Sequence, residues 1–101
     1  MIERDIGRAA RRLLTLCRKQ RLLVATAESC TGGLVIGALT EIPGSSDVVD
    51  RGFVTYSNAA KESMLGVKSA TLKEFGAVSQ QTAEQMAHGA LAHSDAHIAV
   101  A

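Results

Sequence analysis

The sequence has few cysteines, few aromatic residues and no long apolar run. Only two of its 101 residues are cysteines, tryptophan is absent and aromatic residues make up 3%. Cys17 and Cys30 form no C-x-x-C pair and have no histidine at metal-ligand spacing, which argues against a disulfide framework or a zinc site. The three histidines are too scattered to converge on one point, so we expect His88, His93 and His97 on the surface or in loops.

Membrane and export signals are also missing. No apolar stretch approaches the roughly 20 residues that cross a bilayer, and the basic first 21 residues lack the continuous apolar core of a secretory signal. We therefore expect a cytoplasmic protein with reduced cysteines, no bound metal ion and no membrane contact.

What is present is typical of a folded domain, with an uneven distribution of charge. Hydrophobic residues make up 47% and charged residues 21%. Residues 1–21 hold seven basic and two acidic residues, a net charge of +5, whereas residues 22–101 hold four basic and eight acidic residues, a net charge of −4. The arginines lie on the polar side of an amphipathic helix without aromatic residues among them, which favours a solvated face over nucleic-acid binding.

Apolar spacing and turn residues predict alternating helices and strands. We expect helices at 2–20, 31–41, 59–65, 69–75 and 79–91, and strands at 22–27, 51–56 and 96–101. This alternation predicts an α/β fold. We expect a three-layer α/β/α sandwich around a mixed sheet.

A turn rich in small and hydroxyl residues joins the first predicted strand to the second helix. A helix N-terminus has free N–H groups and partial positive charge, so it can hold a phosphate or an oxyanion. Gly32 and Gly33 would let a ligand approach closely. Ser29 is a candidate nucleophile, with Cys30 as a rival that lacks a histidine partner. The structural alternative is that Ser29 or Thr31 only caps the helix.

A second polar cluster follows the second predicted strand and includes Tyr56, Asn58 and Lys61. The start of a helix and burial would both favour the neutral amine of Lys61, which could then act as a base toward Ser29. Alternatively, Lys61 is a solvent-exposed lysine and Tyr56 packs at a strand end. Ligands in α/β folds gather at the carboxyl ends of strands, where both clusters would lie.

Separated motifs along the chain resemble one family. The sequence TAESCTGG stands at 26–33, PGSS at 43–46, GFVTYSNAAK at 52–61, LGV at 65–67 and GAVS at 76–79. In this order they resemble the CinA C-terminal domain, the nicotinamide-nucleotide amidase family that includes the stand-alone PncC members. The resemblance covers nearly the whole chain.

The resemblance implies an enzyme that hydrolyses the carboxamide of nicotinamide mononucleotide, giving nicotinate mononucleotide and ammonia in pyridine-nucleotide salvage, with no cofactor. By position it implies Ser29 as the nucleophile, Lys61 as its base and Tyr56 as a further catalytic residue. It implies substrate contacts from Thr31, Gly32, Gly33, Ser45, Ser46 and Asn58.

Members of that family continue beyond the third strand into a Thr-Gly-Ile-Ala-Gly-Pro-like loop and further elements. Residues 1–101 are therefore expected to form the N-terminal two-thirds of one amidase domain. An uncovered sheet edge would favour a homo-oligomer. The alternative function is a non-catalytic nucleotide-binding or interaction domain of a competence or damage-inducible protein, and nucleic-acid binding through the first helix is a third, less favoured possibility.

Overall fold

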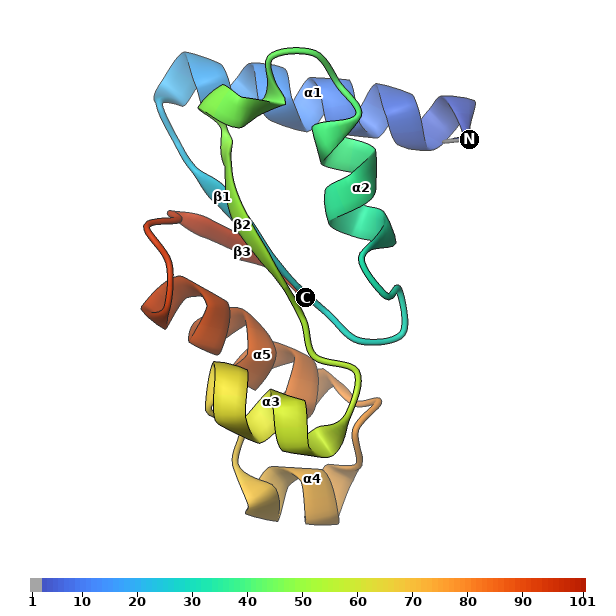
Figure 1. Cartoon of the computed structure of the whole chain (residues 1–101), viewed down its shortest axis with the longest axis vertical. Coiled ribbons are helices and arrows are strands. Elements are labelled where there is room, and N and C mark those ends of the chain that lie inside the picture. The colour runs from blue at the N-terminus through green and yellow to red at the C-terminus, as the bar shows by residue number, and fades with distance from the viewer. Residues whose placement is uncertain (1–2) are drawn as a thin grey trace.

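The computed structural model describes residues 3–101 and has helices on both sides of a small sheet (Figure 1). The elements, in chain order, are α1 (Arg4–Gln20), β1 (Val24–Glu28), α2 (Leu34–Thr40), the 3-10 helix η1 (Ser45–Asp47), β2 (Val49–Val54), α3 (Asn58–Leu65), α4 (Ser69–Phe75), α5 (Gln80–Ala92) and β3 (Ile98–Val100). All the predicted helices and strands are present with shifted ends. Residue 2 of the first predicted helix lies outside the described residues.

The sheet has the strand order β2-β1-β3, and β1 pairs in parallel with both neighbours. The α/β class is confirmed, but the expectation of a mixed sheet was wrong for residues 3–101, whose three strands are all parallel. The strands are parallel because helices connect successive strands and return the chain to the end of the sheet at which the previous strand began. The homo-oligomer expected from an uncovered sheet edge stays a prediction.

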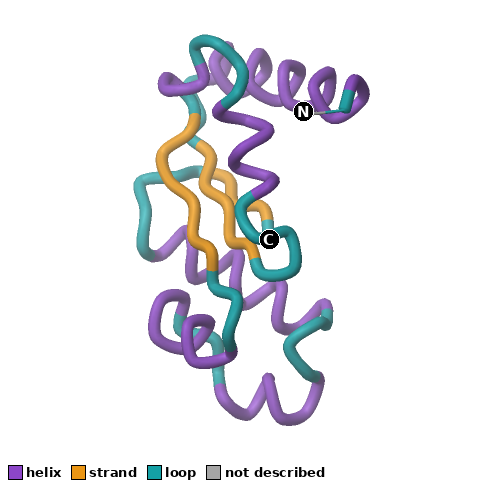
Figure 2. The backbone as a smooth tube through the Cα atoms, turned by 45° about the vertical axis from the view of Figure 1, so that its right-hand side comes forward, coloured by secondary structure: helices purple, strands orange, loops and turns teal. Residues whose placement is uncertain are grey.

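Two apolar clusters hold the helices against the two faces of the sheet. Successive residues of β1 point to opposite faces, so Val24 packs with α1 and α2 while Ala25 and Ala27 pack with the other helices. The first cluster consists of Ala10, Leu14, Cys17, Val24, Leu39 and Val48. The second consists of Ala25, Ala27, Leu65, Val67, Met86 and Ala90. The backbone trace shows the strands between these two groups of helices (Figure 2), which confirms the three-layer arrangement.

Helices α3 and α5 pack closely at Gly89. A β-carbon at residue 89 would lie 2.0 Å from the backbone oxygen of Leu65, so no residue with a side chain fits there without moving one helix. Lys61 lies one turn before Leu65 on α3, and Met86 lies about one turn before Gly89 on α5. The close packing of the two helices therefore fixes the position of the Lys61 side chain relative to that of Met86.

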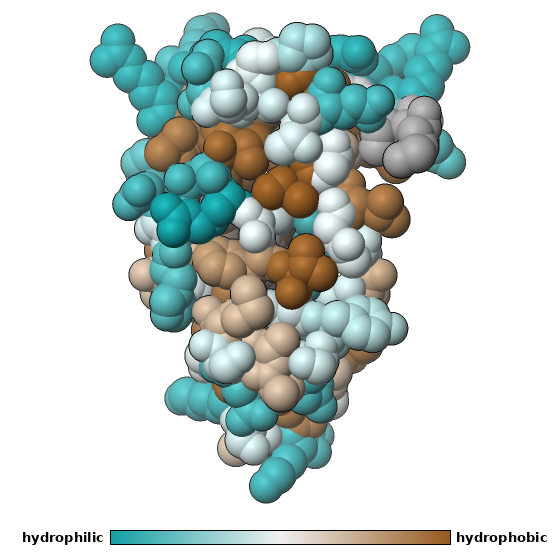
Figure 3. Space-filling view, in the orientation of Figure 1, coloured by the Kyte–Doolittle hydropathy of each residue, from teal (hydrophilic) through white to brown (hydrophobic). Residues whose placement is uncertain are grey.

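Hydrophilic residues gather at the two ends of the molecule in the space-filling view, and hydrophobic residues lie across its middle (Figure 3). Within residues 3–101, no helix combines the length and the apolar character that crossing a membrane requires.

Candidate functional site

Three loops meet at the carboxyl edge of the sheet. They are residues 29–33 after β1, residues 55–57 after β2, and residues 76–79 before α5. A pocket of about 180 Å³ lies between the first and the third of these loops, with Ser29 and Thr31 on one side and Val78, Ala83 and Met86 on the other. Because carboxyl edges of parallel sheets are common ligand sites in α/β folds, this pocket is the candidate functional site.

The carboxylate of Glu28, at the end of β1, binds the start of α2. Its Oε1 accepts hydrogen bonds from the Thr31 hydroxyl at 2.7 Å, from Gly33 N at 3.1 Å and from Val35 N at 2.9 Å. Its Oε2 accepts a fourth, from Ile36 N at 3.0 Å. The residue is 3% exposed. Burial alone would raise the pKa of Glu28, but the Thr31 hydroxyl and the three backbone N–H groups together lower it.

These contacts change the interpretation of residues 29–33, the turn between β1 and α2. The first N–H groups of α2 are bound to Glu28, so they are not free to hold a phosphate or an oxyanion as the sequence suggested. The alternative, a hydroxyl cap by Ser29 or Thr31, was also wrong, because the Thr31 hydroxyl donates to Glu28. Gly32 and Gly33 have φ of 60° and 104°, a backbone conformation that folds the loop back toward Glu28 and that glycine adopts without strain.

Lys61 lies inside the protein at the second loop. It is 1% exposed, and its Nζ donates hydrogen bonds to the backbone oxygens of Thr55 at 3.0 Å and Tyr56 at 2.9 Å. The backbone N–H of Thr55 in turn donates to the oxygen of Glu28 at 2.8 Å. Lys61 is therefore buried, and the alternative of a solvent-exposed lysine was wrong. Two hydrogen bonds in series, through Thr55, link its amine to Glu28, the residue before Ser29.

The structure brings Ser29, Lys61 and Tyr56 to the same edge of the sheet but not into contact. No hydrogen bond joins Ser29 Oγ to Lys61 Nζ within residues 3–101, although Ser29 is only partly exposed and lines the pocket. The Tyr56 side chain is 77% exposed. Asn58 is the exposed first residue of α3, whose cap is the Ser57 hydroxyl that accepts from Ala60 N. The roles of these residues stay predictions.

Ser45 and Ser46 lie at the opposite end of the sheet. They belong to η1, which precedes Val48, and Val48 O accepts a hydrogen bond from Val24 N at the start of β1. Five residues of extended chain separate Val24 from Ser29, about 16 Å at the usual rise of a strand. The buried Ser45 donates to Thr40 O. The PGSS motif thus follows α2 at the amino end of the sheet, away from the Ser29 loop. The expectation that both serines contact the same substrate as Ser29 stays a prediction.

Two features of the site were not predicted from the sequence: the role of Glu28, and the residues of α5 that line the pocket. Glu28 could have been suspected, since acidic residues favour helix N-termini, but it stands five residues before Gly33, outside the usual capping spacing. The GAVS motif did point to the third loop, yet nothing in the sequence alone placed it opposite Ser29.

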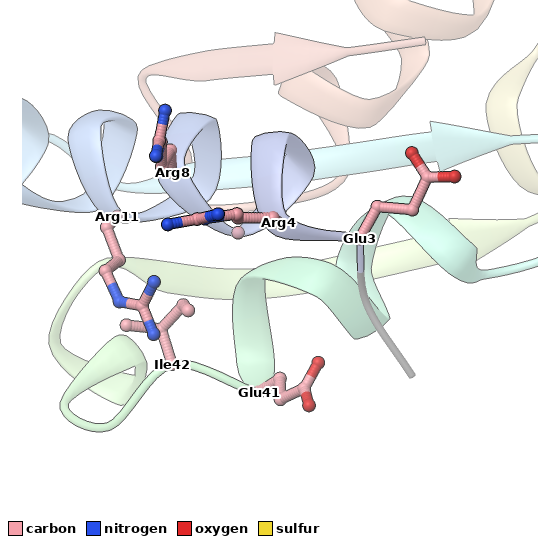
Figure 4. Close-up of a pocket in the computed structure, with 7 residues that line it drawn as sticks. Glu3, Arg4, Arg8, Arg11, Glu41 and Ile42 are labelled. Carbon is pink, nitrogen blue, oxygen red and sulfur yellow. The ribbon is translucent and has the colours of Figure 1, made fainter.

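A larger groove, of about 490 Å³, lies elsewhere and offers no comparable chemistry. It is lined by Glu3, Arg4, Gly7, Arg8 and Arg11 of the first helix region and by Glu41 and Ile42 after α2 (Figure 4). Both signs of charge line it, and none of the three loops reaches it, so we place the site at the smaller pocket. Within the described part of the chain, no group of three or more His, Cys, Asp or Glu side chains could hold a metal ion.

The fold and the position of the pocket define an α/β domain with a candidate ligand site at the carboxyl end of a parallel sheet. Comparison with known proteins identifies the family: the model of the CinA C-terminal domain matches residues 7–101, so the chain belongs to this family.

Relatives and solved structures agree with this assignment. The chain is 57% identical over 77 residues to the nicotinamide-nucleotide amidohydrolase PncC of Enterobacter agglomerans, a match that covers 76% of the chain and 47% of that protein. It is 52% identical over 86 residues to a CinA-like protein of Chlorobium phaeobacteroides, covering 85% of the chain and 20% of that protein.

The crystal structure of the competence/damage inducible protein CihA from Agrobacterium tumefaciens superposes with a TM-score of 0.95 at 63% identity, covering 98% of the chain and 60% of that chain. A CinA superfamily protein from Escherichia coli superposes with a TM-score of 0.91 at 32% identity, covering 98% and 59%. The chain thus spans between a fifth and three fifths of the length of these proteins.

Proposed function

We propose that the protein containing this chain is an amidohydrolase that converts nicotinamide mononucleotide to nicotinate mononucleotide and ammonia, with Ser29 as nucleophile and Lys61 as proton acceptor. The observation that carries the proposal is the buried amine of Lys61, which shares one edge of the sheet with Ser29 and its pocket. The named activity of the relative from Enterobacter agglomerans supports the choice of substrate.

The hydrogen bonds of Lys61 fit a role in proton transfer. A neutral amine has two N–H groups and one lone pair, and Lys61 Nζ donates to two backbone oxygens. No carboxylate forms a salt bridge with it within residues 3–101. In the proposed reaction this amine accepts the proton of Ser29. Catalytic hydrogen bonds are often long without substrate and tighten in its complex.

The proposed reaction has two steps. Ser29 Oγ bonds to the carboxamide carbon while its proton passes to Lys61 Nζ; the C–N bond then breaks, and Lys61 returns the proton to the nitrogen, which leaves as ammonia. Water next attacks the resulting ester while Lys61 Nζ takes a proton from it; the ester C–O bond then breaks, Lys61 returns this proton to Ser29 Oγ, and the carboxylic acid leaves. The N–H groups of Cys30 and Thr31, which have no hydrogen-bond acceptor within residues 3–101, are the donors that the loop retains for the oxyanion.

A second function has one observation in its favour. Lys61 Nζ binds two backbone oxygens and not Ser29, as expected if it only holds the loop after β2. The domain would then bind a nucleotide or a partner without breaking a bond, and several relatives carry names of the CinA-like or competence-damage type that state no reaction.

Ammonia release from nicotinamide mononucleotide by the full-length protein decides between the amidohydrolase and the non-catalytic domain. We expect Ser29→Ala to lower kcat by about 10⁴-fold or more, as removal of a serine nucleophile does in other hydrolases. Ser63→Ala, at an exposed position of α3, is the matched control and should retain full activity. Undiminished activity of Ser29→Ala would exclude Ser29 as nucleophile, whereas nucleotide binding without ammonia release by the unaltered protein would favour the non-catalytic function.

A further inference from the structure

We propose that Glu28 is a positioning residue for the hydrolysis: its buried carboxylate holds the turn after β1 so that the Ser29 hydroxyl and the N–H groups of Cys30 and Thr31 keep one orientation at the pocket. This inference rests on the proposed function and adds a residue that does not touch the reacting atoms. Ser29 lines the pocket, whereas the four donors that bind Glu28 belong to residues 31–36.

The carboxylate of Glu28 lies on the side of the sheet that faces α2. Successive residues of a strand point to opposite faces: Ala27 packs in the apolar cluster that includes Met86 of α5, whereas Glu28 binds N–H groups at the start of α2. Glu28 borders the pocket, but its oxygens already accept four hydrogen bonds, about the full capacity of a carboxylate. Its effect on Ser29 therefore passes through the backbone of the turn.

The side chains of Glu28 and Thr31 enclose the segment that carries the proposed nucleophile. The Thr31 hydroxyl donates to Glu28 at 2.7 Å, so this hydrogen bond bridges the two residues on either side of Ser29 and Cys30. Gly32 N also donates to Ser29 O at 3.0 Å. A short segment that is bridged in this way has little freedom, and a fixed orientation of the nucleophile accounts for a large part of many rate enhancements.

An amide at residue 28 cannot reproduce the four contacts. Oε1 of Glu28 accepts three of the hydrogen bonds, and Oε2 accepts the one from Ile36 N. A glutamine side chain has one acceptor oxygen and one NH₂ group, so an oxygen in the place of Oε1 brings the NH₂ group against the N–H of Ile36, donor against donor. Glu28→Gln therefore disturbs the anchor of the turn with little change in side-chain volume.

Ammonia release from nicotinamide mononucleotide by the full-length protein tests this role. Per folded molecule, we expect Glu28→Gln to lower kcat by about 10²-fold, the effect of a misplacement of about 1 Å. KM should change much less, because the carboxylate does not bind the substrate. Glu41→Gln, the same change at an exposed position just after α2, should retain the kcat and KM of the unaltered protein.

Backbone order parameters measured by NMR test the positioning without substrate. In the unaltered protein and in Glu41→Gln, the N–H groups of Cys30 and Thr31 should have order parameters of about 0.85, as in rigid backbone, and in Glu28→Gln they should fall below about 0.6. Thr31→Val and Thr31→Ser test the same link at an exposed position if Glu28→Gln does not fold. Thr31→Val removes the hydroxyl that binds Glu28 and should lower the order parameter of Cys30, whereas Thr31→Ser keeps the hydroxyl and the order.

The outcomes separate the role of Glu28 from the proposed function. An ordered turn in Glu28→Gln, or in Thr31→Val where Glu28→Gln does not fold, would overturn the positioning role. So would a Glu28→Gln protein that keeps the kcat of Glu41→Gln or that differs from it only in KM. These results leave the amidohydrolase standing. If the unaltered protein releases no ammonia, the amidohydrolase fails, and the order parameters alone then decide whether Glu28 fixes the orientation of the Ser29 turn.

Discussion

The two ends of the sheet treat charged side chains in opposite ways. At the amino end, the ionisable side chains form ion pairs: Arg51 contacts its neighbour in β2, Asp50, at 2.8 Å and Asp95 of the loop before β3 at 3.7 Å, and Arg18 of α1 contacts Asp47 of η1 at 3.9 Å. At the carboxyl end, Glu28 and Lys61 are 3% and 1% exposed. Neither forms a salt bridge within residues 3–101, and their partners are backbone groups and one hydroxyl.

This difference separates exposed ion pairs from buried groups that hold the loops of the candidate site. Exposed ion pairs contribute little to stability, because water screens them and long side chains lose freedom. A buried polar side chain that is hydrogen-bonded to backbone donors or acceptors fixes those backbone groups, and its removal leaves them unsatisfied. The loops that carry Ser29 and Tyr56 are the ones that Glu28 and Lys61 hold. We therefore expect substitutions of Glu28 and Lys61 to lower the free energy of unfolding more than substitutions in the exposed ion pairs.

Glu28→Ala should have the largest effect on folding. It removes the acceptor of the Thr31 hydroxyl and of three N–H groups, and we expect a loss of about 3 kcal/mol in the free energy of unfolding, measured with urea. Glu28→Gln retains one acceptor oxygen and should lose less. Glu62→Ala, at an exposed site on α3, is the control. A loss no greater than that of the control would contradict the capping role of Glu28.

Lys61→Met should come next. The change keeps most of the side-chain length but leaves the oxygens of Thr55 and Tyr56 without their donor, so we expect a loss of about 2 kcal/mol in the free energy of unfolding. Lys68→Met, an exposed lysine of the next loop, should be nearly neutral. Equal stabilities of the two variants would mean that the buried amine does not hold the loop after β2.

The lowered pKa of Glu28 predicts a defined dependence of stability on pH. A carboxyl whose pKa is lower in the folded than in the unfolded protein stabilises the fold fully above the unfolded value, here 4.5, and loses this contribution as the pH falls through the lower folded value. The stability advantage of the unaltered protein over Glu28→Gln should therefore be constant from pH 7 to about 5 and shrink below 4.5. Urea unfolding across this range measures it, and an advantage that grows on acidification would contradict the prediction.

Asp95→Ala should have the smallest effect. Its pair with Arg51 spans 3.7 Å, and the two side chains are 83% and 46% exposed, so we expect a loss below about 1 kcal/mol that disappears in high salt. A loss as large as that of Glu28→Ala would remove the distinction between the two ends of the sheet.

Periodicity and turn residues were sufficient to predict the order of elements. The apolar stripe of the first helix, the proline and glycine after α2, and Gly66 and Gly76 after α3 and α4 each mark local structure, and the helix ends followed them closely. Strand ends were less accurate: β2 begins at Val49 and not at 51, because the pairing with β1, and not the local sequence, decides where a strand starts.

The chemistry of the site could be predicted only in part. Ser29 and Lys61 were singled out because their residue types suit nucleophilic catalysis and each follows a strand, and their roles stay predictions. The role of Glu28 depends on two consecutive glycines with positive φ that fold the loop back to it, and the hydrogen bonds of Lys61 run to residues five and six positions earlier. Such contacts depend on how the loops are folded, which residue types alone do not specify.

The glycine at the crossing of α3 and α5 has a consequence for how the site can evolve. The backbone oxygen of Leu65 occupies the space that any side chain at residue 89 would need, so a substitution there separates the two helices and moves Lys61 and Met86 apart together. In a library of variants selected for folding, Gly89 should therefore stay invariant, whereas an exposed position of the same helix such as Ala92 should vary. The crossing of the two helices therefore limits which sequences can keep the amine of Lys61 in its place.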